Sequence, residues 1–153
     1  MATVDLAAIV RQAFDAFNAK NLDRLASLAH PDARIANVPF GTKLGFREDA
    51  EMWIKAFPDA KCEVTSVTAQ GDNVIAEFTG RGTQSGPLKG PTGEIAATGR
   101  RSEVPCVEVF RFRNGKIAEC KIYFDSAMLL SQLGLGVGAA AQGRAEAAPQ
   151  PRH

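Results

Sequence analysis

Three segments in the first half of the chain have the apolar spacing of amphipathic helices: residues 5–19, 22–29 and 47–57. In the first, large apolar residues recur at steps of three and four and form one stripe: Leu6, Ile9, Val10, Phe14 and Phe17. Asn21 is placed to cap the second helix, and Pro58 follows the end of the third. Acidic residues in the first turn of the third helix complement its dipole.

Beyond these helices, apolar residues recur at every second position, which is typical of strands with one buried face. Residues 62–70 and 74–79 flank a Gly-Asp-Asn turn and predict one hairpin. Residues 103–113 and 116–125 flank an Asn-Gly turn, the strongest hairpin signal in the chain, and predict a second. A short strand is also expected over residues 33–38.

Three further segments complete the picture. Residues 80–99 hold six glycines and two prolines and predict a long functional loop or lid. Residues 126–134 predict a closing helix, and residues 136–153 are too poor in large apolar side chains to fold and predict a tail. We therefore expect one α+β domain over residues 1–135. Three helices laid on a strongly curved antiparallel sheet would form an open cone around an internal apolar pocket.

Composition narrows the class of protein. The chain has 153 residues, 45% hydrophobic, with a formal net charge of +1, so no basic excess points to nucleic acid. No apolar run is long enough to span a bilayer and no signal peptide is visible, which predicts no membrane partner and a cytoplasmic protein. Three widely spaced cysteines fit reduced thiols rather than a disulfide framework, and two histidines offer no zinc site.

Several short segments, in this order and spacing, resemble the SnoaL-like polyketide cyclases of the ketosteroid-isomerase-like superfamily. They are Phe17–Asp23 (FNAKNLD), Phe57–Asp59 (FPD), Gly82–Gly86 (GTQSG), Pro91–Gly93 (PTG), Phe110–Ile117 (FRFRNGKI), and Tyr123–Asp125 (YFD) through Gln132–Gly134 (QLG). The resemblance covers residues 4–134. It implies a cystatin-like, nuclear-transport-factor-2-like fold with an apolar pocket, commonly as a homodimer. Members include cyclases that close rings by aldol chemistry, epoxide hydrolases, isomerases, dehydratases and proteins without chemistry, so the fold alone does not give the reaction.

The resemblance places a catalytic carboxylate at the end of the last strand. Asp125 falls where SnoaL-like cyclases carry an aspartate general acid/base, and burial in an apolar pocket would raise its pKa toward neutrality. The other interpretation is that Asp125 caps the closing helix. We expect Lys121 and Tyr123 to lie on the same face of the strand as Asp125. Lys121 replaces a tryptophan of many relatives, and it would either face the pocket or reach solvent at the rim. Ile122 and Phe124 would then lie on an outer face that needs covering, which favours a homodimer.

Other candidates come from the remaining elements. Glu108 stands where ketosteroid isomerases carry a protonated pocket aspartate, or it forms a cross-strand ion pair. Asn37 replaces the isomerase base and would hold a substrate carbonyl or water. Gln84 replaces a histidine common in the family and would orient a ligand or turn the loop. Trp53 and Phe110 would line the pocket.

Two functions follow as hypotheses. The first is a cofactor-independent enzyme that cyclises or isomerises a small apolar carbonyl compound, with Asp125 and Glu108 catalytic. The second is a non-catalytic small-molecule-binding or dimerisation module, favoured by the lysine at position 121 and the glutamine at position 84. Neither requires a cofactor or a metal.

Overall fold

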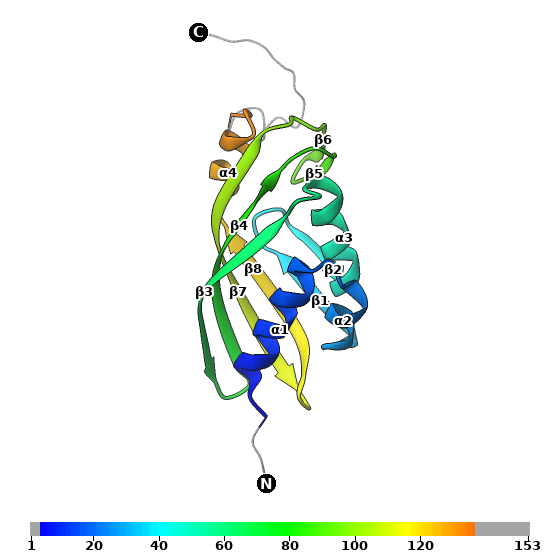
Figure 1. The fold of residues 1–153 in the computed structure, drawn as a ribbon, viewed down its shortest axis with the longest axis vertical. Helices are drawn as coiled ribbons and strands as arrows, with labels where there is room; N and C mark the ends of the chain where they lie inside the picture. The colour runs from blue at the N-terminus through cyan, green and yellow to red at the C-terminus, as the bar shows by residue number, and fades with distance from the viewer. Residues whose placement is uncertain (1–3, 137–153) are drawn as a thin grey trace.

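The helices form where the apolar stripes predict them. In the computed structural model, which describes residues 4–136, α1 spans Leu6–Asn18, α2 Leu22–Ser27 and α3 Phe46–Ala56 (Figure 1). The carboxylate of Asp5 accepts a hydrogen bond from the backbone N–H of Ala8 at 3.1 Å and caps α1. The three predicted N-terminal helices are therefore confirmed.

The strands form one six-stranded sheet in the order β2-β1-β8-β7-β4-β3. Their bounds are Ala29–Asn37 (β1), Thr42–Gly45 (β2), Lys61–Gln70 (β3), Asn73–Thr83 (β4), Arg101–Arg113 (β7) and Lys116–Phe124 (β8). Both predicted hairpins are present, as β3–β4 and β7–β8. The prediction of an antiparallel sheet is wrong, because β1 pairs with β8 in parallel. A parallel pair needs a long connection, and most of the chain lies between these two strands.

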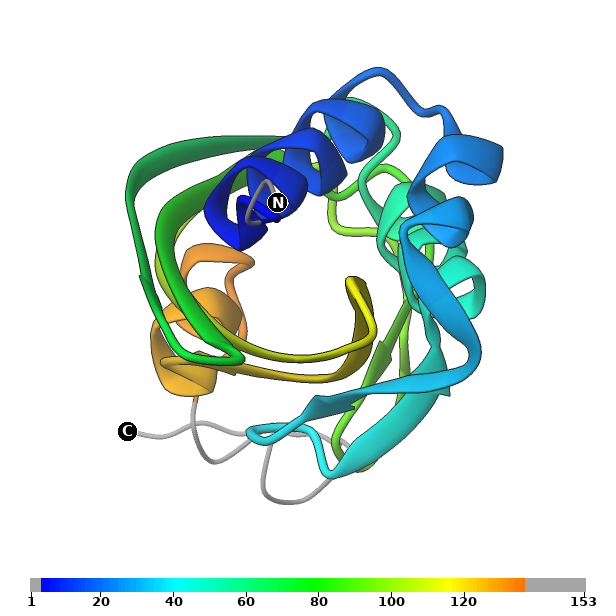
Figure 2. The same ribbon diagram turned by 90° about the horizontal axis from the view of Figure 1, so that it is seen from below.

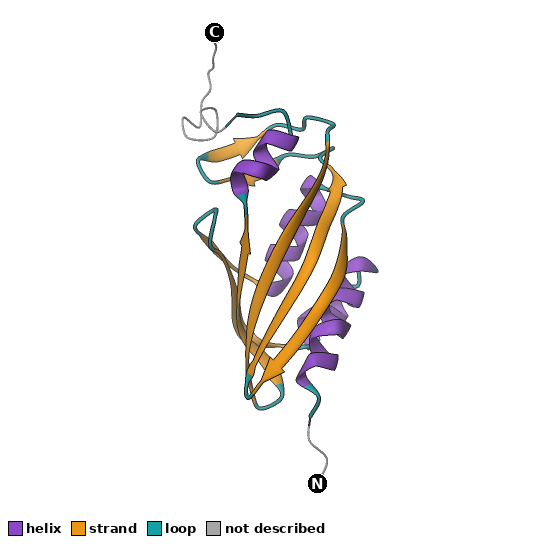
Figure 3. Cartoon of the chain, turned by 90° about the vertical axis from the view of Figure 1, so that its left-hand side faces the viewer, coloured by secondary structure: helices purple, strands orange, loops and turns teal. Residues whose placement is uncertain are grey.

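Half of the segment expected to be a long loop, residues 80–99, forms strands. β4 continues to Thr83, and a two-stranded sheet follows, made of β5 (Leu88–Gly90) and β6 (Gly93–Ile95). This hairpin lies at one end of the molecule near α4 (Ser126–Gln132), as Figure 3 shows. The prediction of one long loop is therefore wrong: Leu88 is fully buried and fixes the hairpin in a second apolar cluster.

The main core lies between the inner face of the sheet and helices α1–α3, which cover that face (Figure 2). Val10 and Phe14 of α1 pack toward β4 and β7, where the Phe14 ring lies 4.8 Å from the Phe78 ring, centroid to centroid. Within residues 4–136, no helix is long and apolar enough to cross a membrane. The predicted tail, apart from Gly136, falls outside the described residues.

Candidate functional site

A cavity of about 150 Å³ lies between the sheet and helices α1 and α3. Its walls are mainly aromatic and aliphatic, with side chains from α1, α3, β3, β4, β7 and β8. The inward face of β7 contributes every second residue from Ser102 to Phe110, in keeping with the period of a strand. A cavity of this size encloses a group about as large as benzene.

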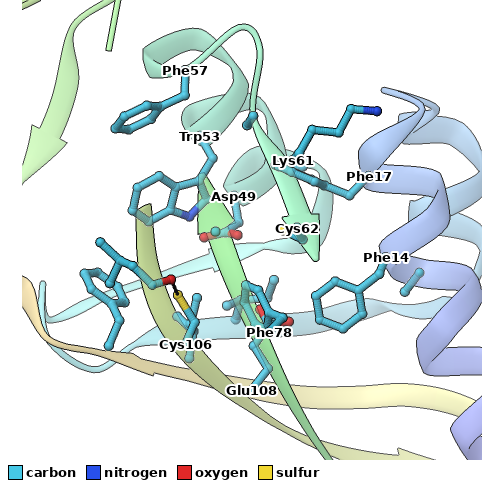
Figure 4. A pocket seen from close by; sticks show the side chains of 18 of the residues that line it. Phe14, Phe17, Asp49, Trp53, Phe57, Lys61, Cys62, Phe78, Cys106 and Glu108 are labelled. Carbon is cyan, nitrogen blue, oxygen red and sulfur yellow. Dashed lines mark hydrogen bonds between the residues drawn. The ribbon is translucent and has the colours of Figure 1, made fainter. Parts of the chain in front are cut away.

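Asp49 brings a carboxyl group into this apolar cavity from α3 (Figure 4). It is 7% exposed, and its Oδ1 atom is buried without a hydrogen-bond partner among the described residues. Burial raises the pKa of Asp49 to about 7, because the apolar surroundings penalise the charged form. Asp49 therefore changes charge near neutral pH.

Glu108 brings a second carboxyl group from β7, on the opposite wall (Figure 4). Burial, and to a lesser extent the charge of Asp49, raise the pKa of Glu108 to about 8, although a hydrogen bond from the Cys120 thiol acts to lower it. No ion pair reaches Asp49 or Glu108 within residues 4–136. The expected cross-strand ion pair of Glu108 is therefore wrong: its β4 and β8 partners are Ala76 and Ile122.

Three thiols surround Glu108. Cys62 and Cys106 line the cavity, and Cys120 is buried behind it. Burial raises the pKa of each thiol above its ordinary value, and the charge of Glu108 adds to this effect. The thiols are therefore protonated at neutral pH and are poor nucleophiles. In the described part of the chain, no cluster of histidine, cysteine or acidic residues is suited to hold a metal ion.

Three of the residues singled out from the sequence line the cavity: Glu108, Trp53 and Phe110. The Trp53 ring lies 6.0 Å from the rings of Phe40 and Phe124 and 6.2 Å from that of Phe57, measured between centroids. Trp53 therefore belongs to an aromatic group at one end of the cavity.

The side chains of β8 face the opposite way to the expectation. Lys121, Tyr123 and Asp125 are exposed, whereas Ile122 and Phe124 line the cavity. The physical reason is that the apolar alternate residues of β8 gain more from burial than the polar ones. Asp125 accepts a hydrogen bond from the N–H of Met128 at 3.0 Å and caps α4, as the alternative interpretation had it. The outward apolar face inferred from Ile122 and Phe124 is wrong, and the homodimer stays a prediction.

Asn37 and Gln84 are buried but do not line the cavity. Asn37 accepts a hydrogen bond from the N–H of Phe40 at 3.0 Å and shapes the β1–β2 turn. The Gln84 amide donates to three backbone oxygens and accepts two hydrogen bonds from Thr98. Gln84 therefore fixes the segment that carries β5 and β6, and the structure gives it no contact with the cavity.

Asp49 is the site residue that sequence reasoning missed. Its position in the first turn of a helix suggested only a favourable interaction with the helix dipole. However, Asp49 lies three residues after Phe46 and four before Trp53, on the apolar stripe of α3. A carboxylate at a core position of an amphipathic stripe is the signal that would have identified it.

Comparison with known proteins gives a family and a fold. Residues 7–133 match the sequence model of the SnoaL-like polyketide cyclase family. Among functionally curated proteins, no match was found. AclR from Streptomyces galilaeus, named as a candidate hydroxylase, is 26% identical, with a TM-score of 0.72 over 87% of this chain and 98% of its own.

Two further solved structures are similar. IdmH from Streptomyces antibioticus, named as a candidate polyketide cyclase, is 28% identical, with a TM-score of 0.69 over 86% of this chain and 99% of its own. A protein from Catenulispora acidiphila with a ketosteroid-isomerase-like fold, solved in complex with trimethylamine, is 21% identical. Its TM-score is 0.67 over 83% of this chain and 92% of its own, and it shows the shared fold alone.

Proposed function

Since this chain belongs to the SnoaL-like polyketide cyclase family, we propose that it is a cofactor-independent enzyme that moves a proton on a small carbonyl compound held in the cavity. The observation that carries the proposal is the carboxyl group of Glu108, which lies in an apolar cavity and has its pKa raised to about 8. A carboxyl group tuned close to the working pH is effective both as a base and as an acid.

One carboxyl group suffices for the reaction. Ionised Glu108 takes a proton from the carbon next to the carbonyl, and the electron pair of the broken C–H bond forms an enolate. In a cyclisation, the enolate carbon attacks a second carbonyl carbon of the same molecule, and the resulting alkoxide takes the proton back from Glu108. In an isomerisation, Glu108 returns the proton to a different carbon. Both routes regenerate the carboxylate and need no redox partner.

The apolar walls support this role. They surround the Glu108 carboxylate with apolar side chains, which leaves it poorly solvated and therefore a stronger base than in solution. The aromatic group around Trp53 packs against the carbon skeleton of a ligand. In this proposal the cavity is the internal apolar pocket of a curved sheet. The trimethylamine complex of the Catenulispora acidiphila protein supports binding of a small molecule by this architecture.

Hydrogen–deuterium exchange at the carbon next to the carbonyl tests the proposal without knowledge of the natural substrate. Cyclohexanone in D₂O, followed by NMR, is of a size that the cavity encloses. We expect exchange above the buffer rate with the wild-type protein and a loss of about 100-fold or more with Glu108→Gln. Exchange that Glu108→Gln leaves unchanged would contradict the role of Glu108.

Asp125→Asn is the matched variant, because it makes the same carboxyl-to-amide change outside the cavity. We expect its exchange rate to equal that of the wild-type protein, because Asn retains the helix cap. A loss confined to Asp125→Asn would instead support the catalytic role that the family resemblance suggested for Asp125.

A non-catalytic binding module is the second candidate. It is favoured by the inward residues of β8, Cys120, Ile122 and Phe124, which supply no strong acid or base to the cavity. This alternative predicts saturable binding of small ketones, with no exchange above the buffer rate in any variant.

A further inference from the structure

Asp49 is a buried carboxyl group without a partner. The residue is 7% exposed, its Oδ1 atom makes no hydrogen bond among the described residues, and no ion pair reaches it. An unpaired carboxylate at such a position costs folding free energy, whereas an apolar residue of similar size would not. Asp49 is also one of the residues that line the cavity, so its unpaired carboxyl group is placed to receive a hydrogen bond or a positive charge from a ligand.

The surroundings of Asp49 suit one kind of ligand. Trp53 lies one turn further along α3, and Figure 4 shows its indole ring and the Asp49 carboxyl group side by side at the cavity. The faces of indole rings attract cations more strongly than those of other aromatic side chains. Glu108 supplies a second carboxyl group on the opposite wall. An ammonium group in the cavity would therefore lie between negative groups and an aromatic face.

The cations near the cavity do not neutralise these carboxyl groups. Lys61 reaches the edge of the cavity, but it is exposed and its ammonium group points away from Asp49 (Figure 4). Arg81 also lies at the edge, and its guanidinium group donates to the carboxylate of Glu63. The interior is therefore negative whenever Asp49 or Glu108 is ionised, which disfavours carboxylate and phosphate ligands.

We propose that Asp49 and Trp53 bind an ammonium group, so that the cavity selects small ligands that carry a basic or quaternary nitrogen. This inference deepens the proposed function, since it names the substrate class as carbonyl compounds with a cationic nitrogen. It also links binding to chemistry. A cation between the two carboxyl groups favours the ionised form of Glu108, which is the form that takes the proton.

A pair of probes that differ only in charge tests the inference by binding alone. Choline carries a trimethylammonium group, and 3,3-dimethylbutan-1-ol has the same shape with carbon in place of nitrogen. Trp53, the single tryptophan of the chain, reports binding by its fluorescence. At pH 8, above the pKa of Asp49 at about 7, we expect choline to bind about tenfold more tightly than the alcohol.

Two variants locate the effect. Asp49→Asn keeps the shape of the side chain and removes its charge. We expect it to reduce the preference for choline from about tenfold to about threefold, because Trp53 and Glu108 still attract the cation. Glu108→Gln should keep the preference for choline while it loses proton exchange, which separates this inference from the proposed function. Equal affinities in the wild-type protein, binding of neither probe, or a preference for choline that Asp49→Asn leaves undiminished would each overturn the inference.

Discussion

Replacing Asp49 with asparagine tests the burial of this carboxyl group through the stability of the fold. The pKa of Asp49 is about 7 in the folded protein, against 3.8 for an ordinary aspartate. Between these two values the folded chain holds a proton that the unfolded chain has released. The contribution of Asp49 to stability is therefore greatest at low pH and falls as pH rises from about 4 to about 7, because ionising Asp49 in the folded state becomes a cost.

The size of the effect follows from the same two pKa values. Each pH unit within the interval corresponds to about 1.4 kcal/mol, so the full interval is worth about 4 kcal/mol of unfolding free energy. Asparagine has no charge to bury and removes this dependence. We expect the stability of Asp49→Asn relative to the wild-type protein to grow by about 2 to 3 kcal/mol between pH 5 and pH 8.

Urea unfolding monitored by the fluorescence of Trp53 measures this difference at each pH. Glu51→Gln on the same helix is the matched control, because it makes the same carboxyl-to-amide change in a side chain that is exposed in the folded state. A difference between Asp49→Asn and the wild-type protein that stays constant from pH 5 to pH 8 would refute the reasoning.

Three further substitutions address the groups that support the site. The hydrogen bond from the Cys120 thiol lowers the pKa of Glu108, and Cys120→Ala removes it. In a carboxyl ¹³C NMR titration, we therefore expect the pKa of Glu108 to rise in Cys120→Ala and to return toward the wild-type value in Cys120→Ser. Gln84→Leu leaves three backbone oxygens without their donor, and we expect a loss of about 2 to 4 kcal/mol of unfolding free energy in urea. Gly86→Ala places a Cβ atom in steric conflict with the backbone oxygen of Lys55, so it should lower the Tm by several degrees. An unchanged Tm would show that the contact relaxes freely.

The sequence predicts much of the fold because its local signals agree with each other. The stripe of α1, the Asn-Gly turn between β7 and β8, and the caps at Asp5 and Asn21 are local interactions that depend on few distant contacts. The parallel pairing of β1 with β8 joins segments far apart in the chain, and no local pattern encodes it.

The site was harder to predict because two arguments disagree on which face of β8 points into the cavity. The polar residues favour one face by their chemistry, and the apolar residues favour the other by their burial. Assigning a catalytic role to Asp125 placed Lys121 and Tyr123 in the cavity, whereas burial of apolar area turns Ile122 and Phe124 inward. Glu108, which the resemblance matched to a pocket aspartate of the isomerases, lines the cavity among apolar residues on the same face of β7, and its catalytic role stays a proposal.

Gln84 was misleading for a different reason. Its fully buried amide satisfies the backbone of a glycine-rich segment, and a sequence does not distinguish such a structural amide from one that binds a ligand. The order of the β5–β6 hairpin follows from this amide and from the burial of Leu88, both of which are tertiary contacts.

The pH titration of the two cavity carboxyl groups tests the central claim most directly. Side-chain ¹³C NMR would follow Asp49 and Glu108, with each resonance assigned by its loss in Asp49→Asn or Glu108→Gln. We expect the pair to titrate with apparent pKa values of about 7 and 8, and the pKa of Glu108 to fall when Asp49 is replaced. Titration of both groups near pH 4 would show that water solvates them, and would contradict both the proposed proton transfer and the buried carboxyl pair on which it depends.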